Sequence, residues 1–81
     1  MASAIEDEKA KYTRTKANGK TVLKNDAETD AAYEKYLLES GEASRVQNVR
    51  QNKIVYYDKD GNRKVVDKTT ILDKMSTYNA T

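Results

Sequence analysis

Leucine, isoleucine and valine together make up only 13 of the 81 residues, about 16% of the chain. A share below roughly 20% goes with disorder when the net charge is high, but here the net charge is only +2. The chain has no cysteine and no histidine, so neither a disulfide nor a structural zinc site can reinforce its core. We therefore expect one small domain with a thin core, stabilised further by association with other chains.

The missing residue types also exclude most of the chemistry of small enzymes. Without histidine or cysteine, the chain lacks the usual general base and the thiol nucleophile. Residues 58–62 place their glycine wrongly for a calcium loop, and residues 19–21 lack the upstream glycine of a phosphate loop, because Arg14 stands there. We expect no enzymatic activity, no cofactor and no metal site.

The first 25 residues are predicted to form an N-terminal arm. Residues 2–11 contain good helix formers after a cap at Ser3, but Ile5 is their one strongly apolar residue. Asn18-Gly19 lies between segments that contain threonine and valine, which favours a tight type I′ hairpin. A flexible loop fits the same segment nearly as well, because its flanks are mostly polar.

Residues 26–81 are predicted to form a small single α+β domain. A helix over residues 26–40 is indicated by apolar side chains at helical spacing. Asn25 or Asp26 can cap its first turn, and Gly41 can take the left-handed conformation that ends it.

Residues 45–67 have the pattern of β-structure. The β-branched and aromatic residues 54–57 indicate the strongest strand, and an earlier strand is expected to pair with it. The spacing of Val46 and Val49 breaks strict alternation, which predicts a bulge or an irregular edge between them.

Asp60-Gly61 predicts a second two-residue hairpin turn. Pairing across such a turn would set Asp58 opposite Arg63, and Tyr56 opposite Val65. A cross-strand pair of opposite charges would stabilise this register.

A short helix over residues 69–78 is predicted to close the domain. Thr70 and Asp73 have the spacing of a capping box, and the residues that follow give the helix an apolar face. The predicted core consists of eight residues from the two helices and the β region: Tyr33, Tyr36, Leu37, Val55, Tyr56, Val65, Leu72 and Met75.

Positive charge is concentrated in the β region. Residues 1–44 carry 7 bases and 9 acids, whereas residues 45–68 carry 7 bases and 3 acids. Basic strands with aromatic neighbours, here Tyr56 and Tyr57, can bind nucleic-acid phosphates and stack on bases. An ordinary solvated sheet face fits the same residues, and an acidic segment beside a basic one also suits head-to-tail packing of identical subunits.

The order of helix, glycine-containing link, basic hairpin and helix resembles the small head-completion proteins of tailed phages, the lambda W-protein type. The resemblance covers roughly residues 30–78, while residues 1–25 have no counterpart in it. It is carried by Gly41 and by seven apolar positions: Tyr33, Leu37, Val46, Val55, Tyr56, Leu72 and Met75.

This resemblance implies a non-enzymatic virion protein. Its copies would form a ring below the portal, close the exit of the packaged genome and present a surface to the tail. The N-terminal arm would reach onto a neighbouring subunit. Five basic residues would contact acidic groups of partners or DNA: Arg45, Arg50, Lys53, Arg63 and Lys64.

Three functions follow as hypotheses from the sequence. The first is an assembly subunit of a phage neck, which binds other copies of itself and neighbouring structural proteins. The second is a small nucleic-acid-binding domain that uses the basic hairpin, and the third is a phage or bacterial inhibitor that docks on a host protein. No segment approaches the roughly 20 apolar residues of a membrane span, and no signal peptide is recognisable. We expect a cytoplasmic protein without membrane contact, found in the virion if the resemblance holds.

Overall fold

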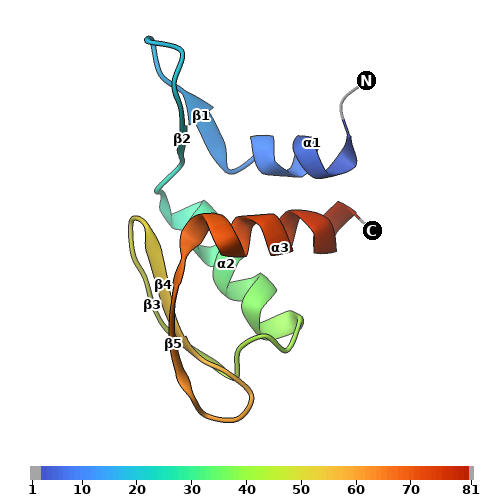
Figure 1. The fold of residues 1–81 in the computed structure, drawn as a ribbon, viewed down its shortest axis with the longest axis vertical. Coiled ribbons are helices and arrows are strands. Elements are labelled where there is room, and N and C mark those ends of the chain that lie inside the picture. Colours follow the sequence, from blue (N-terminus) through green and yellow to red (C-terminus); the bar gives the residue numbers. More distant parts are fainter. Residues whose placement is uncertain (1–2, 81) are drawn as a thin grey trace.

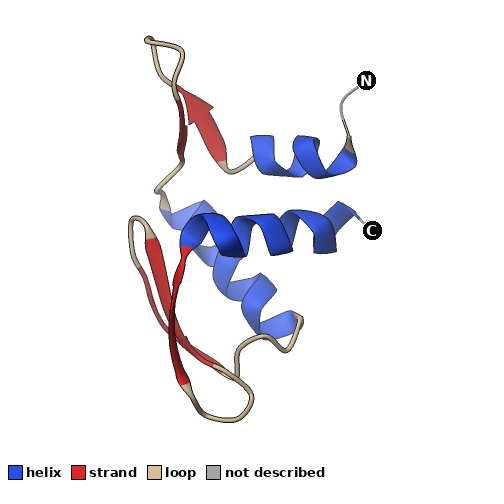
Figure 2. Cartoon of the chain, viewed as in Figure 1, coloured by secondary structure: helices blue, strands red, loops and turns tan. Residues whose placement is uncertain are grey.

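The computed structural model describes residues 3–80 and has the expected α+β fold (Figure 1). The helices span Ala4–Ala10 (α1), Ala27–Glu39 (α2) and Lys68–Ala80 (α3). The strands span Thr13–Thr15 (β1), Thr21–Leu23 (β2), Arg45–Val49 (β3), Lys53–Tyr57 (β4) and Arg63–Asp67 (β5). β1 and β2 form a hairpin, and β3, β4 and β5 form an antiparallel sheet with β4 in its centre (Figure 2).

α2 begins at the predicted cap. The Asp26 carboxylate accepts hydrogen bonds from the backbone N–H and the hydroxyl of Thr29, both at 2.8 Å. The Thr29 hydroxyl in turn accepts from the backbone N–H of Asp26, which completes a capping box. At the other end, Gly41 has φ +79°, and the chain then turns so that the N–H of Ala43 reaches the carbonyl of Leu37.

The hairpin between β4 and β5 is one residue longer than predicted. The N–H of Asp58 donates to the carbonyl of Asn62, and the N–H of Gly61 donates to the carbonyl of Asp58. Gly61 has φ +84°, but no described residue other than glycine has a positive φ, so a type I′ turn at Asp60-Gly61 is wrong. Three residues, 59–61, form the loop, with a glycine in the left-handed region at its end.

This extra loop residue moves Val65 out of the core. β4 and β5 pair with Tyr56 opposite Lys64 and Val55 opposite Val65, and Asp58 does not face Arg63. A shift of one residue turns every side chain to the other face of a sheet. The prediction that Val65 lies in the core is therefore wrong: it is 48% exposed, and Val66 takes the inward position.

The hairpin between β1 and β2 has the same three-residue loop. The N–H of Lys16 donates to the carbonyl of Lys20, which leaves residues 17–19 as the loop. Gly19 has φ +84° and again occupies the last loop position, while the side chain of Asn18 accepts from the N–H of Lys20. The segment is therefore a hairpin, but not of the type I′ that Asn18-Gly19 predicted.

The irregular edge predicted near Val46 is present in β3. Its register against β4 shifts between Val46 and Asn48, so that Gln47 is the extra residue of a β-bulge.

α3 begins at Lys68, directly after β5, and the capping box predicted at Thr70 and Asp73 is wrong because both residues lie inside the helix. The N–H of Lys68 donates to the carbonyl of Asn52 and so still belongs to the β4–β5 ladder. No loop separates strand from helix, so α3 begins two residues before the predicted cap at Thr70.

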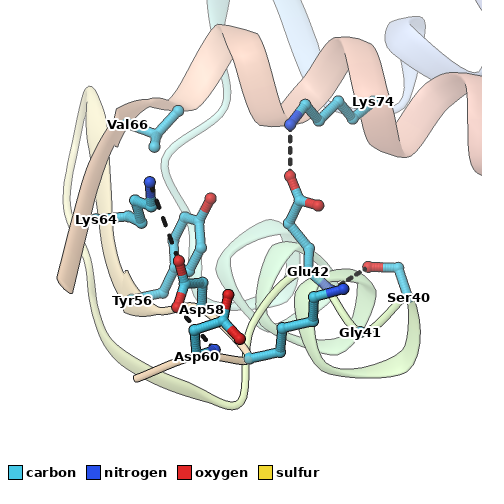
Figure 3. Close-up of a pocket in the computed structure, with 10 residues that line it drawn as sticks. Ser40, Gly41, Glu42, Tyr56, Asp58, Asp60, Lys64, Val66 and Lys74 are labelled. Carbon is cyan, nitrogen blue, oxygen red and sulfur yellow. Dashed lines mark hydrogen bonds and ion pairs between the residues drawn. The ribbon is translucent and has the colours of Figure 1, made fainter. Parts of the chain in front are cut away.

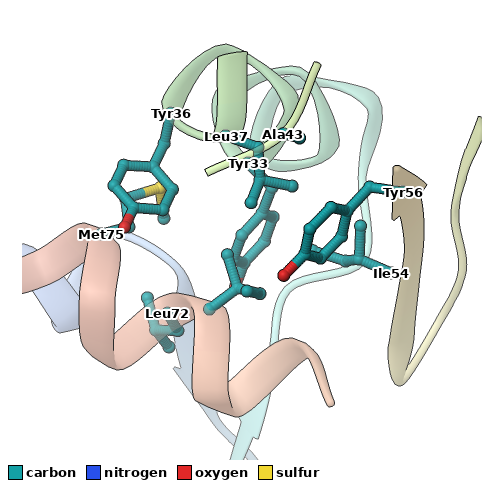
Figure 4. Close-up of a cluster of buried hydrophobic side chains, with 9 residues drawn as sticks. Tyr33, Tyr36, Leu37, Ala43, Ile54, Tyr56, Leu72 and Met75 are labelled. Carbon is teal, nitrogen blue, oxygen red and sulfur yellow. The ribbon is translucent and has the colours of Figure 1, made fainter. Parts of the chain in front are cut away.

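The core lies between α2, α3 and the inner face of the three-stranded sheet (Figure 4). Six of the eight predicted core residues belong to it, joined by Ala43, Ile54 and Ile71. Val55 is also fully buried, but it lies outside this cluster. The cluster consists of Tyr33, Tyr36, Leu37, Ala43, Ile54, Tyr56, Ile71, Leu72 and Met75.

The N-terminal arm contacts its own chain. α1 lies along α3 (Figure 1), and Lys9 of α1 forms an ion pair with Asp73 of α3 at 3.0 Å. The ring of Tyr12 lies 5.7 Å from that of Tyr33, and Leu23 of β2 also packs against the core. α1 itself contributes no buried residue, as its single apolar side chain predicts.

Candidate functional site

The three-stranded sheet has a second face that points away from the core. Side chains directly opposite each other on neighbouring strands point to the same face. Ile54 and Tyr56 point inward, so Tyr57 points outward together with its partners Arg45 on β3 and Arg63 on β5. These three residues form one row across the outer face.

A second row lies at the other end of the outer face. Arg50 and Lys53 oppose each other across the turn between β3 and β4, where the N–H of Arg50 donates to the carbonyl of Lys53 at 2.8 Å. On its other side, Lys53 pairs with Asp67, and their charged groups are 2.8 Å apart. We call Arg45, Arg50, Lys53 and Arg63 the basic face. Within the described strands, Asp67 is the one acid on this side of the sheet.

Tyr57 holds Arg45 in place at this surface. The guanidinium carbon of Arg45 lies 4.3 Å from the centroid of the Tyr57 ring, a cation–π contact. Such a contact contributes about 0.5–1 kcal/mol at an exposed site. The half-buried ring therefore restrains the arginine without using its hydrogen-bond donors.

Val55 and Val65 lie between the two basic rows. They face each other on β4 and β5, and Val55 is fully buried in the middle of the outer face, while Val65 is exposed. The outer face thus presents the exposed side chain of Val65 between positive charges at its two ends. This combination suits contact with another macromolecule more than binding of a small ligand, because the surface is open.

Lys64, the fifth predicted contact residue, lies on the opposite face. It is paired with inward-facing Tyr56, and its Nζ is 4.0 Å from an oxygen of Asp58. Lys64 lines a hollow of about 490 Å³ between the β4–β5 loop, the link after α2, and α3 (Figure 3). The structure therefore brings together four of the five predicted residues.

The hollow has paired charges and no evident reactive group. Lys74 of α3 donates a hydrogen bond to Glu42, and this bond raises the pKa of Lys74. Asp58 accepts from the backbone N–H of Asn62, which is the main reason that its pKa lies below the ordinary value. Three lysines and three acids line the hollow, so it offers no excess charge to a charged ligand.

Lys68 is fully buried, although it is absent from the predicted core. Its Nζ donates to Asn25 at 2.9 Å, to Asp30 at 2.8 Å and to the carbonyl of Arg50 at 3.0 Å. A signal for this position exists in the sequence, since Lys64, Val66 and Lys68 continue the inward alternation of β5. All three ammonium hydrogens have acceptors, so Lys68 holds the fold together and is not available to a ligand.

Tyr33 lies beside this network. Its ring centroid is 5.2 Å from the Lys68 Nζ, and its hydroxyl is buried without a hydrogen-bond partner among the described residues. Burial, with smaller contributions from Tyr12 and Asp30, raises the pKa of Tyr33 to about 12. The phenol thus stays protonated at neutral pH and does not act as a base.

Comparison of the chain with protein-family models, with curated proteins and with solved structures yields no match. Within residues 3–80, no three acidic side chains gather in a way that could hold a metal ion. None of the described helices is long and apolar enough to cross a membrane. The basic face is therefore the best-defined candidate site on the described part of the chain.

Proposed function

We propose that the protein is a non-enzymatic assembly subunit that binds neighbouring structural proteins through its basic face. One arrangement supports this: three strands and the β3–β4 turn bring four cationic side chains to one face, and the one acid that the described strands add to it is already paired with Lys53. An acidic surface on a partner would complement this face and fix its orientation. The absence of histidine and cysteine from the 81 residues agrees with a role in contact rather than catalysis.

The neck of a tailed phage is the place we propose for this subunit. The proposal rests on the sequence resemblance to head-completion proteins over roughly residues 30–78, although three strands, β3 to β5, and not a single hairpin lie between α2 and α3. In a ring between head and tail, the basic face would meet acidic groups of the portal ring or of the next subunit.

A mixing experiment tests this proposal. The chain is combined with the portal ring encoded in the same genome and analysed by size-exclusion chromatography with light scattering. The wild-type chain should elute with the ring, and the double variant Arg45→Glu, Arg50→Glu should not. The matched control is Lys16→Glu, Lys20→Glu, which changes the charge equally at the exposed end of the β1–β2 hairpin and should still bind. Elution of the wild-type chain as if no ring were present would contradict the proposal.

Nucleic-acid binding is the second candidate, and the row Arg45–Tyr57–Arg63 favours it. Two arginines flank a half-buried aromatic ring, an arrangement suited to phosphates spaced along a strand. Fluorescence anisotropy with a labelled single-stranded oligonucleotide would test it across a salt series. With four cations engaged, the logarithm of the binding constant should fall with the logarithm of the salt concentration with a slope of roughly −3. Absence of binding at low salt would exclude this candidate.

A further inference from the structure

β5 is an unprotected edge of the three-stranded sheet. The opposite edge, β3, carries a bulge and lies against α2, two features that hinder pairing with another strand. β5 pairs with β4 without a register shift, and four of its five residues are exposed. A regular, open strand of this kind is a template for the addition of another strand.

The backbone groups at this edge belong to Arg63, Val65 and Asp67. Backbone hydrogen bonds join Asp58 to Asn62 and Lys68 to Asn52 at the two ends of the β4–β5 ladder. In an antiparallel ladder the hydrogen-bonded pairs alternate, so Lys64 and Val66 direct their backbone groups toward β4. Their neighbours Arg63, Val65 and Asp67 direct theirs toward the free edge.

The sequence of β5 is complementary to itself when a second copy runs antiparallel. With Val65 opposite the same residue of the other copy, Arg63 faces Asp67 of the other copy at both ends. All three side chains lie on the outer face, so the register creates two opposite-charge pairs around one apolar contact. The same register brings the free backbone groups of both strands together, because Arg63, Val65 and Asp67 all point to the edge.

We propose that two copies of this chain pair through β5, antiparallel and centred on Val65, to form one continuous sheet of six strands. The Asp67 side chain can serve both partners, since Lys53 contacts its Oδ1 and the other oxygen can accept from Arg63 of the second copy. The inference goes beyond the proposed function: it joins two copies through the backbone of the sheet edge, with Arg63 as the one residue shared with the basic face, and its test needs no other protein.

Two consequences follow for the assembly. A five-residue edge buries less surface than a standard interface, so the dimer should have a dissociation constant of about micromolar or weaker. The contact is two-fold and closes on itself, so a ring would need a second, different surface between dimers. The paired sheet would also place the basic faces of two copies side by side.

Charge reversal at the two ends of β5 tests the register. Arg63→Asp and Asp67→Arg would each set like charges opposite each other in a homodimer. Each variant alone should therefore dimerise about tenfold more weakly than the wild type in sedimentation velocity across a concentration series. An equal mixture of the two variants restores both opposite-charge pairs and should dimerise as the wild type does. Failure of the mixture to recover, or a wild-type chain that stays monomeric at every concentration, would overturn the proposal.

Amide hydrogen exchange checks the pairing independently of any substitution. In the monomer, the amides of Arg63 and Val65 face solvent and should exchange fast, while those of Lys64 and Val66 are bonded to β4. At dimer-forming concentrations, the amides of Arg63 and Val65 should become protected. If the chain dimerises and these two amides still exchange fast, β5 is not the interface and the proposal is wrong. Because no portal ring takes part, either result is separate from the test of the proposed function.

Discussion

The ammonium group of Lys68 lies 2.8 Å from the carboxylate of Asp30, and the lysine side chain is fully buried while the acid is partly exposed. The same ammonium donates to Asn25 in the link before α2 and to the carbonyl of Arg50 in the β3–β4 turn. One cation at the start of α3 therefore connects three segments, the furthest of them 43 residues away in the sequence. In a chain with so few aliphatic residues, this network fixes the arrangement of α2 and α3 around the sheet.

Replacement of Lys68 by methionine should destabilise the fold by about 2–3 kcal/mol. The change keeps the length of the side chain but leaves Asp30 and two neutral acceptors without their donor. We place the effect below the full value for a buried pair, because Asp30 is partly exposed to solvent. Urea denaturation followed by circular dichroism measures it.

Lys53→Met is the matched control for that substitution. Lys53 and Asp67 are also 2.8 Å apart, but both side chains are more than half exposed. Solvent screens such a pair, so the loss should be within about 0.5 kcal/mol. Equal losses at Lys68 and Lys53 would show that burial of the network does not stabilise the fold as we argue.

Tyr33→Phe should leave stability unchanged or raise it by about 1 kcal/mol. The Tyr33 hydroxyl is buried without a partner among the described residues, so its removal relieves an uncompensated desolvation and keeps the ring in the core. Urea denaturation at neutral pH is the measurement. A loss of 1 kcal/mol or more would mean that the hydroxyl makes a bond that stabilises the fold.

The same substitution should alter the response to alkali. The pKa of Tyr33 is raised to about 12 from an ordinary value of 10.0, so the unfolded chain loses this proton at lower pH than the folded chain. The contribution of Tyr33 to stability is complete below pH 10 and is lost as pH rises through the folded pKa. Thermal unfolding between about pH 9 and 12 should show a smaller loss for Tyr33→Phe than for the wild type. Identical pH profiles would contradict this assignment.

Asp26→Asn should reduce the sensitivity of the fold to acid. The backbone hydrogen bond from Thr29 lowers the pKa of Asp26, so its stabilising effect is present above the ordinary pKa and is lost as pH falls through the folded pKa. Asparagine caps a helix as well as aspartate does but does not titrate in this range. Thermal unfolding from about pH 5 down to about pH 2 should fall less steeply in the variant. Some loss should remain, because the pKa of Asp58 is also lowered.

The loop between β4 and β5 predicts an asymmetry between two adjacent residues. Gly61 has φ +84°, whereas Asp60 has no positive φ. Gly61→Ala should therefore destabilise the fold by about 1 kcal/mol, through backbone strain, since no atom crowds the position. Asp60→Ala should have a smaller effect, whereas a type I′ turn would strain both variants. Thermal unfolding of the two variants decides between the loop types.

Local patterns predicted the helices and the bulge of this fold well, because neighbours in the sequence determine them. The cap at Asp26 and the end of α2 at Gly41 require only residues within one helical turn. The wrong placement of Val65 came from a single loop residue, since Asp60-Gly61 fits a two-residue and a three-residue turn alike. The local sequence does not determine which of the two turns is more stable. That depends on which side chains of β5 pack into the core.

The candidate site was predictable in composition but not in arrangement. The five basic residues predicted as contacts are visible in the sequence, yet their division between two faces depends on the register that the loop sets. The role of Lys68 was also not predictable from the local sequence. Its position continues the inward alternation of β5, but its acceptors Asn25, Asp30 and Arg50 come together only in the folded chain.

Lysine acetylation is the most direct test of the proposal that the protein binds its partner through the outer face of the three-stranded sheet. Lys53 and Lys64 belong to the same sheet, each lies near an aspartate, and their side chains are about equally exposed, but they point to opposite faces. The chain is acetylated alone and in complex with the portal ring, and both sites are quantified by mass spectrometry. We predict that the ring protects Lys53 and leaves the reactivity of Lys64 unchanged. Protection of Lys64 alone, or equal reactivity of both lysines in the complex and in the free chain, would contradict the account.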